Sequence, residues 1–193
     1  MEFYNLNLKV ILIFFVLNLI LFQAKSNAMV LDKLAKPGKT TQDQQWEFFT
    51  DGVMGGLSDG NVKLDKINKE NCYRMTGNVT TENNGGFIQI RAILKPSIKA
   101  SNYEGIYLKV YGNNERYYLS LKTPYTKAPW QNYKFGFKVK KNWQEIKAPF
   151  SKFKRSHFYQ PKDVKKQKIK SVGLLAGFDD FKADICLAEI GFY

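Results

Sequence analysis

Histidine and cysteine are scarce in this sequence, which contains one histidine, His157, and two cysteines, Cys72 and Cys186. Three such residues are too few for an ordinary zinc site built from Cys and His ligands. A lone histidine between Ser156 and Phe158 is more typical of a surface or packing residue than of a catalytic base. The motifs G-x-S-x-G and H-E-x-x-H are absent, as is a glycine loop that cradles phosphate. The sequence therefore predicts a protein that is not an enzyme, with no metal or cofactor.

The sequence also lacks an apolar stripe at helical spacing sustained over three turns. Aromatic residues make up 15% of the chain, and such side chains favour half-buried sheet surfaces. Every second residue is apolar in residues 106–110, 117–121 and 135–139, which is the period of a strand with one buried face. We expect Gly112-Asn113-Asn114 to join the first two of these runs as a hairpin turn.

Short strands separated by turn residues continue through most of the chain. Eight or nine are indicated, with candidates at residues 46–49, 62–64, 72–79, 87–94, 106–110, 117–121, 135–139, 172–176 and 185–192. Spacings of roughly ten residues are typical of a sandwich or barrel. We therefore predict one all-β domain over residues 46–193. Residues 29–45 are polar and contain Pro37-Gly38, so we expect them to be a linker.

A leader precedes the domain. The apolar run of residues 10–22 has 13 residues, which fits the core of a signal peptide and is shorter than the roughly 20 needed to span a bilayer. Ser26-Asn27-Ala28 supplies small residues for cleavage after Ala28, and no cysteine follows the run to carry a lipid. We expect residues 1–28 to be a signal peptide and the protein to be exported, either periplasmic or secreted. The alternative is a membrane anchor over residues 6–22.

Acidic residues are few, 17 against 30 Lys and Arg, so the net charge is +13. Within residues 134–170, 13 basic residues accompany only Glu145 and Asp163. All but one of the 13 are lysines, which favours a solvated face over bidentate recognition of phosphate. Weak attraction to an anionic membrane surface is the alternative. An exported protein rarely meets nucleic acid, so we expect no nucleic-acid partner.

Two features leave alternatives open. An exported compartment permits a disulfide between Cys72 and Cys186, but two separate buried thiols would also fit the sequence. Asp179 and Asp180 are neighbours, with Asp184 close by. Adjacent residues of a strand point to opposite faces, so we expect the acidic pair to cap a turn, with a calcium site as the alternative.

One glycine-rich segment stands out between two predicted strands, Asp51-Gly52-Val53-Met54-Gly55-Gly56-Leu57-Ser58. Its glycines allow positive φ or close backbone approach, and Asp51 can hydrogen-bond its own turn. One interpretation is an ordered turn in which Trp46 and Met54 enter the core and the glycines avoid clashes. The glycines given this structural role are Gly52, Gly55, Gly56, Gly85 and Gly86.

The other interpretation makes this segment part of a ligand surface. Asp51 and Met54 would then contribute to binding. Three aromatic residues in or near a loop-like stretch are further binding candidates, namely Tyr125, Trp130 and Tyr133.

Several motifs in order along residues 46–193 resemble the complex I intermediate-associated proteins of thirty kilodaltons. The hallmark is a tryptophan followed by Asp-x-Val-Met-Gly-Gly-x-Ser, matched by Trp46 and residues 51–58. Residues 81–88 (Thr-Glu-Asn-Asn-Gly-Gly-Phe-Ile) and 103–106 (Tyr-Glu-Gly-Ile) follow, then Trp143 with Pro149-Phe150, and the last strand at residues 185–190. The resemblance implies a galactose-binding-like jelly-roll β-sandwich. It also implies a role in assembling respiratory complex I (NADH:ubiquinone oxidoreductase), with no catalytic residues to carry over.

Two departures separate this chain from the family pattern. The leader is typical of a secretory signal, not of an Arg- and Ser-rich mitochondrial presequence. The family's Gly-Asp-Gly turn is Gly112-Asn113-Asn114 here. We therefore weigh two hypotheses: a chaperone-like assembly module that holds a protein partner, including membrane-protein subunits, at or near a membrane; and an exported carbohydrate-binding module. An enzyme, the third class, would require a pocket that brings His157 to a carboxylate.

Overall fold

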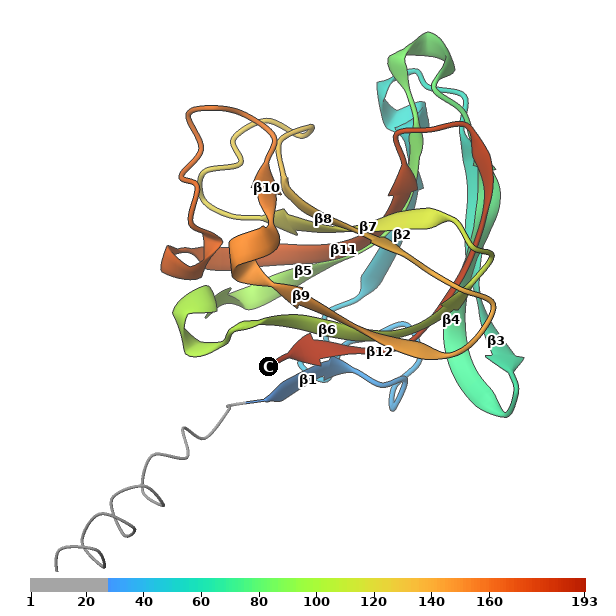
Figure 1. Cartoon of the computed structure of the whole chain (residues 1–193), viewed down its shortest axis with the longest axis horizontal. Helices are drawn as coiled ribbons and strands as arrows, with labels where there is room; N and C mark the ends of the chain where they lie inside the picture. The colour runs from blue at the N-terminus through green and yellow to red at the C-terminus, as the bar shows by residue number, and fades with distance from the viewer. Residues whose placement is uncertain (1–27) are drawn as a thin grey trace, which may run out of the picture.

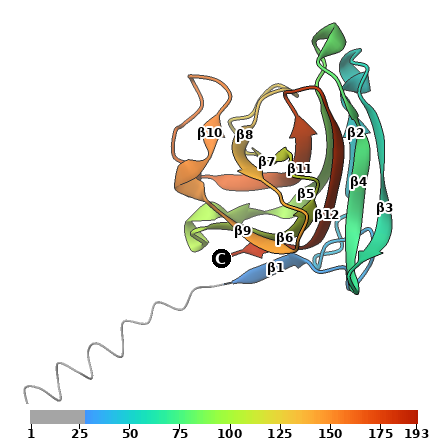
Figure 2. The ribbon, with the colours of Figure 1, turned by 45° about the vertical axis from the view of Figure 1, so that its right-hand side comes forward.

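The computed structural model describes residues 28–193, so the predicted signal peptide lies outside the described residues except for Ala28. Within this range two antiparallel sheets pack face to face, which confirms the all-β prediction (Figure 1). Figures 1 and 2 show β3 and β4 at one side of the molecule and β10 at the opposite side. The described part of the chain contains no helix long and apolar enough to cross a bilayer.

Each sheet has six strands. The first sheet runs in the order β3 (Asp59–Ile67), β4 (Glu70–Val79), β12 (Phe181–Phe192), β6 (Gly105–Gly112) and β9 (Gln144–Pro149), with β1 (Met29–Asp32) also paired to β12. The second sheet runs in the order β10 (Lys154–Arg155), β8 (Tyr133–Lys138), β7 (Arg116–Lys122), β11 (Lys168–Gly177), β5 (Phe87–Lys99) and β2 (Trp46–Thr50). Short 3-10 turns connect them at η1 (Asp51–Met54), η2 (Glu82–Asn84), η3 (Ala100–Asn102), η4 (Phe150–Lys152) and η5 (Val164–Lys166).

The core lies between the sheets and follows from the two-residue alternation of each strand. In β7, Leu119 and Leu121 point inward and are fully buried, as are Val172 and Leu174 opposite them on β11. Burying one such aliphatic side chain contributes about 1.5–3 kcal/mol. The same alternation sends the intervening residues of β7 and β11 to the outer face of the second sheet.

The hairpin predicted at Gly112-Asn113-Asn114 is wrong. Strand β6 belongs to the first sheet and β7 to the second, so this turn carries the chain across the sandwich. The Tyr117 hydroxyl holds the crossing, because it donates to Asn113 Oδ1 (2.6 Å) and accepts from the backbone N–H of Asp184 (2.9 Å). Both strands show alternation because each buries one face, and alternation does not reveal which sheet a strand joins.

Residues 29–45 are packed against the domain and do not form the predicted linker. Strand β1 pairs with β12, and Leu31 is fully buried. Asp32 accepts hydrogen bonds from the Trp46 indole (2.6 Å) and the Tyr73 hydroxyl (3.0 Å), which ties this segment to both sheets. The polar side chains that suggested a linker supply this anchoring. Strands β1, β9 and β10 are the three absent from the sequence prediction.

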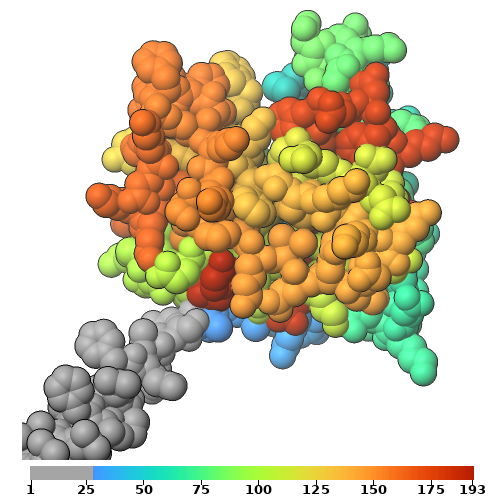
Figure 3. Space-filling model, in the orientation of Figure 1, coloured from blue at the N-terminus to red at the C-terminus, as the bar shows by residue number. Residues whose placement is uncertain are grey.

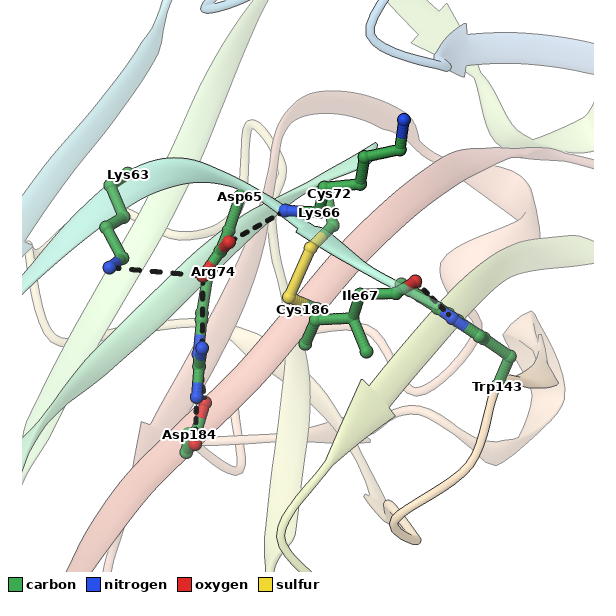
Figure 4. The surroundings of a disulfide bond; sticks show 9 residues. All are labelled: Lys63, Asp65, Lys66, Ile67, Cys72, Arg74, Trp143, Asp184 and Cys186. Atoms are coloured by element: carbon green, nitrogen blue, oxygen red, sulfur yellow. Dashed lines mark hydrogen bonds and ion pairs between the residues drawn. A yellow bond between two sulfur atoms is a disulfide. The ribbon is translucent and has the colours of Figure 1, made fainter. Parts of the chain in front are cut away.

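The outer face of the first sheet is fastened by a disulfide between Cys72 on β4 and Cys186 on β12 (Figure 4). Beside it, Arg74 donates to Asp184 (2.8 Å) and to Asp65 (3.0 Å). These two carboxylates raise the pKa of the already basic guanidinium, which stays charged. The bond and the ion pairs join β3, β4 and β12 into one surface.

Candidate functional site

A groove of about 1060 Å³ crosses the outer face of the second sheet. One wall is formed by residues 123–130, which follow β7. The opposite wall is formed by η1, by residues 85–87 and by Phe178. In Figure 3 the hollow at the top lies between the yellow atoms of the first wall, with orange atoms of a neighbouring segment beside them, and the green and red atoms of the second wall.

One row of outward-facing residues crosses the sheet at the floor of this groove. Paired positions on adjacent strands run from Glu47 through Arg91, Gly173 and Ser120 to Lys134. Gly173 has no side chain and Ser120 has a short one, and the amide of Gln89 lies over Gly173, so small polar groups separate the two cations. Adjacent strands are about 4.8 Å apart, so Arg91 and Lys134 are separated by roughly 14 Å at the backbone.

Arg91 is the most constrained charge on the floor. Its Nη2 donates to Glu47 Oε2 (2.9 Å), and its guanidinium lies 4.7 Å from the centre of the Phe49 ring. Its Nε is buried without a hydrogen-bond partner among the described residues. Stacking on Phe49 fixes the plane of the guanidinium, so its donors are oriented before any ligand arrives.

Lys122 lies on the same outer face, at the base of the 123–130 wall. Its ammonium donates to the backbone carbonyls of Pro129 (2.5 Å) and Gln131, and so holds that wall in place. Burial, together with the nearby charge of Arg91, lowers the pKa of Lys122 to about 8. At neutral pH the groove therefore contains a cation that is partly desolvated and lies near a second one.

Aromatic side chains occupy both walls and one end of the floor. Trp130 is 61% exposed at one rim, and Phe178 is 44% exposed at the other. Phe49 and Phe87 meet edge to face on the floor, with ring centres 5.8 Å apart. Flat apolar faces beside Gln89, Ser120 and Arg91 combine stacking surfaces with hydrogen-bonding groups.

The Asp51–Ser58 segment forms part of the second wall, and its aspartate is buried beneath it. The carboxylate of Asp51 accepts from the N–H (3.0 Å) and the hydroxyl (2.6 Å) of Ser58 and from the N–H groups of Gly86 and Phe87. Burial alone would raise the pKa of Asp51, but these hydrogen bonds outweigh it and hold the pKa below its usual range. Asp51 thus joins the loop after β2 to the loop before β5.

The glycines of this wall have distinct roles. Gly55 ends η1 with φ of +85°, a conformation that disfavours side chains with a Cβ. A Cβ on Gly56 would lie 2.3 Å from the Asp51 carboxyl carbon, and one on Gly85 would lie 2.4 Å from its oxygen. Both glycines therefore let the backbone close around Asp51. The amide of Gly52 donates to Thr50 Oγ1 (3.1 Å), which caps the start of η1.

The structure brings only some of the sequence-derived binding candidates together. Met54 and Trp130 line the groove from opposite walls, and Gly85 and Gly86 line it beside Met54. Tyr125 is 50% exposed but lies outside the groove lining.

Two of the predicted binding residues are buried instead. The Asp51 carboxylate is inaccessible beneath the wall. Tyr133 is fully buried on the core side of β8, where its hydroxyl donates to Pro161 O (2.8 Å). It shares the inward face of β8 with Phe135 and Phe137, two and four residues further on. Met54 likewise does not enter the core and is 49% exposed, whereas Trp46 packs against the core.

The residues considered for catalysis or metal binding lie apart from the groove. His157 Nδ1 is 2.9 Å from the Ser156 hydroxyl, and its ring lies beside Tyr159. Asp180 accepts from the N–H (2.7 Å) and hydroxyl (2.8 Å) of Thr81. Among residues 28–193 no three His, Cys, Asp or Glu side chains gather as a metal site would require.

Sequence reasoning missed most of the groove floor. Glu47, Phe49, Gln89, Arg91 and Lys122 were not singled out, although all line the groove. A usable signal exists in the predicted strand 87–94, because alternation places Phe87, Gln89 and Arg91 on one face opposite the apolar residues.

Known structures share this architecture at low sequence identity. The family 11 carbohydrate-binding module of a Clostridium thermocellum cellulosomal cellulase matches with a TM-score of 0.65 and 16% identity, over 88% of this chain and 95% of that one. The module from that organism in complex with a β-1,3-1,4-mixed-linked tetrasaccharide matches with a TM-score of 0.62 and 16% identity, over 86% and 94%. A family 30 carbohydrate-binding module matches with a TM-score of 0.51 and 13% identity, over 72% of this chain and 91% of that one. These likenesses confirm the galactose-binding-like jelly-roll fold.

The sequence itself is assigned by a family model. No curated protein matches it. The model for complex I intermediate-associated protein 30 matches residues 35–187, which covers the motif of residues 51–58 and every strand of the sandwich except β1 and the end of β12. The chain therefore belongs to the complex I intermediate-associated protein 30 (CIA30) family.

Proposed function

We propose that this protein is a non-catalytic binding module that holds a polysaccharide chain in the groove over its second sheet. The observation that carries the proposal is the groove itself, about 1060 Å³ in volume, with Trp130 and Phe178 on opposite rims and hydrogen-bonding groups between them. Sugar rings stack on aromatic faces and direct their hydroxyls to polar side chains. The likeness in fold to carbohydrate-binding modules, one of them in complex with a tetrasaccharide, supports this ligand class.

The charges of the groove support binding without hydrolysis. Glycoside hydrolysis ordinarily uses a pair of carboxyl groups that flank the scissile bond. Among the described residues that line the groove, Glu47 alone carries a carboxylate, and Arg91 pairs with it at 2.9 Å. An ion-paired carboxylate is poorly suited to donate a proton.

Affinity measurements on polysaccharides test the proposal. Affinity gel electrophoresis of the protein against a panel of soluble neutral and acidic polysaccharides should show retardation by at least one of them. Trp130→Ala and Phe178→Ala should each weaken that binding at least tenfold, because each removes a stacking surface from one rim. Phe158→Ala is the matched control, since Phe158 is 84% exposed and lies outside the groove lining. Retardation by no polysaccharide, or equal retardation of all four proteins, would exclude the groove as a saccharide site.

A second candidate is a chaperone-like assembly module that holds a protein partner at or near a membrane. The family's name describes association with an intermediate of complex I. The tip of the second wall exposes three apolar side chains, Val53 (71%), Met54 (49%) and Leu57 (54%), which is the composition of a protein contact. A pull-down from solubilised membranes should then recover respiratory subunits, and Val53→Ser with Leu57→Ser should abolish the recovery. Equal recovery by that double variant would exclude the tip as the contact.

The proposed setting for either function is outside the cytoplasm. The disulfide between Cys72 and Cys186 supports export, because such bonds persist in oxidising compartments. The N-terminal sequence of the protein purified from each cell fraction tests this. A chain beginning at Met29 in the exported fraction is expected, and an intact Met1 in the membrane fraction would favour the anchor.

A further inference from the structure

We infer that the polysaccharide held in the groove is anionic, with carboxylate or sulfate groups along the chain. The inference rests on the proposed function and names the chemistry of its ligand. Four of the described residues that line the groove are cationic, and one, Glu47, is acidic. The four cations are Arg91, Lys122, Lys127 and Lys170.

The lysines of the groove have no acidic partners on the protein. Ion pairs within residues 28–193 engage eight other basic residues, Arg91 among them, but none engages Lys122, Lys127 or Lys170. Lys134, at the end of the floor row, lies 3.7 Å above the Phe178 ring and is also without an acidic partner in this part of the chain. Like charges gathered on one concave surface repel one another, and a bound anion relieves that repulsion.

The placement of these cations fits a linear polymer better than a single small anion. Arg91 and Lys134 are three strands apart on one row, with Gly173 and Ser120 between them. Lys122 is two residues beyond Ser120 on β7, so the two side chains lie on the same outer face of the sheet. A chain that crosses the strands would therefore meet positive charge at successive points.

The aromatic rims separate this ligand from an acidic peptide or a membrane. Trp130 and Phe178 are exposed aromatic side chains on opposite rims of the groove, which suits a ligand made of rings. A bilayer surface could not enter a groove between two raised walls. Binding to an acidic peptide and non-specific binding to polyanions are outcomes that the following test distinguishes.

Isothermal titration of the folded chain with four polymers tests the inference: polygalacturonate, a sulfated carrageenan, the neutral mixed-linkage β-glucan and polyglutamate. Either acidic polysaccharide should bind at least tenfold more tightly than the glucan and polyglutamate. The uronate and sulfate arms identify which anionic group is preferred. Arg91→Gln should weaken that binding at least tenfold and Lys170→Gln at least threefold.

Lys66→Gln is the matched control, because Lys66 is exposed on β3 of the other sheet and its loss changes net charge equally. Equal weakening in Lys66→Gln and the groove variants would show non-specific attraction and overturn the inference. If the neutral glucan bound more tightly than the acidic polysaccharides, and Trp130→Ala abolished that binding, the inference of an anionic ligand would be overturned while the proposed function would stand. Binding of polyglutamate alone, or of no polymer, would remove the proposed function as well. The melting temperature of each variant identifies any that fails to fold. If Arg91→Gln does not fold, Lys170→Gln still tests the inference.

Discussion

The outer faces of the two sheets carry similar residue types but use them differently. On the first sheet the charges pair with one another: Arg74 with Asp65 and Asp184, and Lys109 with Glu70 at 3.0 Å. On the second sheet one ion pair, Arg91 with Glu47, accompanies a set of lysines without acidic partners among the described residues.

The difference indicates what each face is for. The first face is cross-linked by Cys72–Cys186, and the ion pairs of Arg74 and Lys109 connect its strands, so these side chains stabilise the fold. The second face is concave; Glu47 and Phe49 hold Arg91 in position, and the groove lysines have no acidic partner among the described residues. Preorganised and unsatisfied groups in a hollow are the usual mark of a binding site. The comparison predicts that changes on the first face alter stability and changes on the second alter binding.

The largest expected effect comes from removing the disulfide. Cys72→Ala with Cys186→Ala opens a cross-link between residues 114 positions apart, and should lower the free energy of unfolding by about 4 kcal/mol. Chemical denaturation of oxidised wild type and the double variant measures the change. The saccharide affinity of the folded variant should be unchanged. If the folded variant lost affinity, the first face would contribute to binding as well as to stability, contrary to the comparison.

Loss of the buried carboxylate beneath the groove wall should come next. Asp51→Ala leaves the N–H groups of Ser58, Gly86 and Phe87 without their acceptor, at a cost of about 3 kcal/mol. Asp179→Ala, at an exposed position, is the control and should change stability little. Because the folded-state pKa of Asp51 is lowered, its contribution is complete above about pH 4 and disappears as pH falls through that lower value. Denaturation at pH 6 and pH 3 should therefore show a smaller acid loss in Asp51→Ala than in wild type.

A smaller effect is expected where the wall turns. Gly55→Val places a β-branched residue at φ of +85° and should lower stability by about 2 kcal/mol. Gly55→Asn should cost less, because asparagine tolerates this conformation. No atom lies within 4 Å of a Cβ built on Gly55, so the difference would report backbone strain alone. Equal melting temperatures for the two variants would show that the turn does not depend on left-handed backbone.

The smallest effect is a pH dependence of binding that only the second face should show. Lys122 has a pKa of about 8, so raising the pH through that value removes a positive charge from the groove. Arg91, Lys170 and Glu47 also line the groove, and an anion bound there would raise the pKa of Lys122. If binding raises the pKa of Lys122 from about 8 to about 9, affinity for an acidic polysaccharide should fall about sevenfold between pH 7 and pH 9.5. Titration of Lys122→Arg, which stays charged, should show no such fall; an equal fall would assign it to another group.

The fold was largely predictable, because its signal is local. Alternation at residues 106–110, 117–121 and 135–139 reports which side chains are buried, and that is enough to identify strands. The polar segment 29–45 was misread because β1 is short and its anchoring depends on Tyr73 and β12. The hairpin at residues 112–114 was misread because pairing between strands is a long-range property.

The site divides along the same line. The sequence by itself determined the Asp51–Ser58 turn, since an acidic residue and two adjacent glycines within six positions already specify a tight, internally bonded loop. It also placed Met54 and Trp130 among the candidates, and both line the groove. Only the tertiary structure decided that Tyr133 faces the core. It alone also brings four residues of the groove onto one surface, namely Glu47, Arg91, Lys122 and Phe178. Those residues come from four separate segments, and antiparallel pairing of distant strands, not sequence spacing, sets the distances between them.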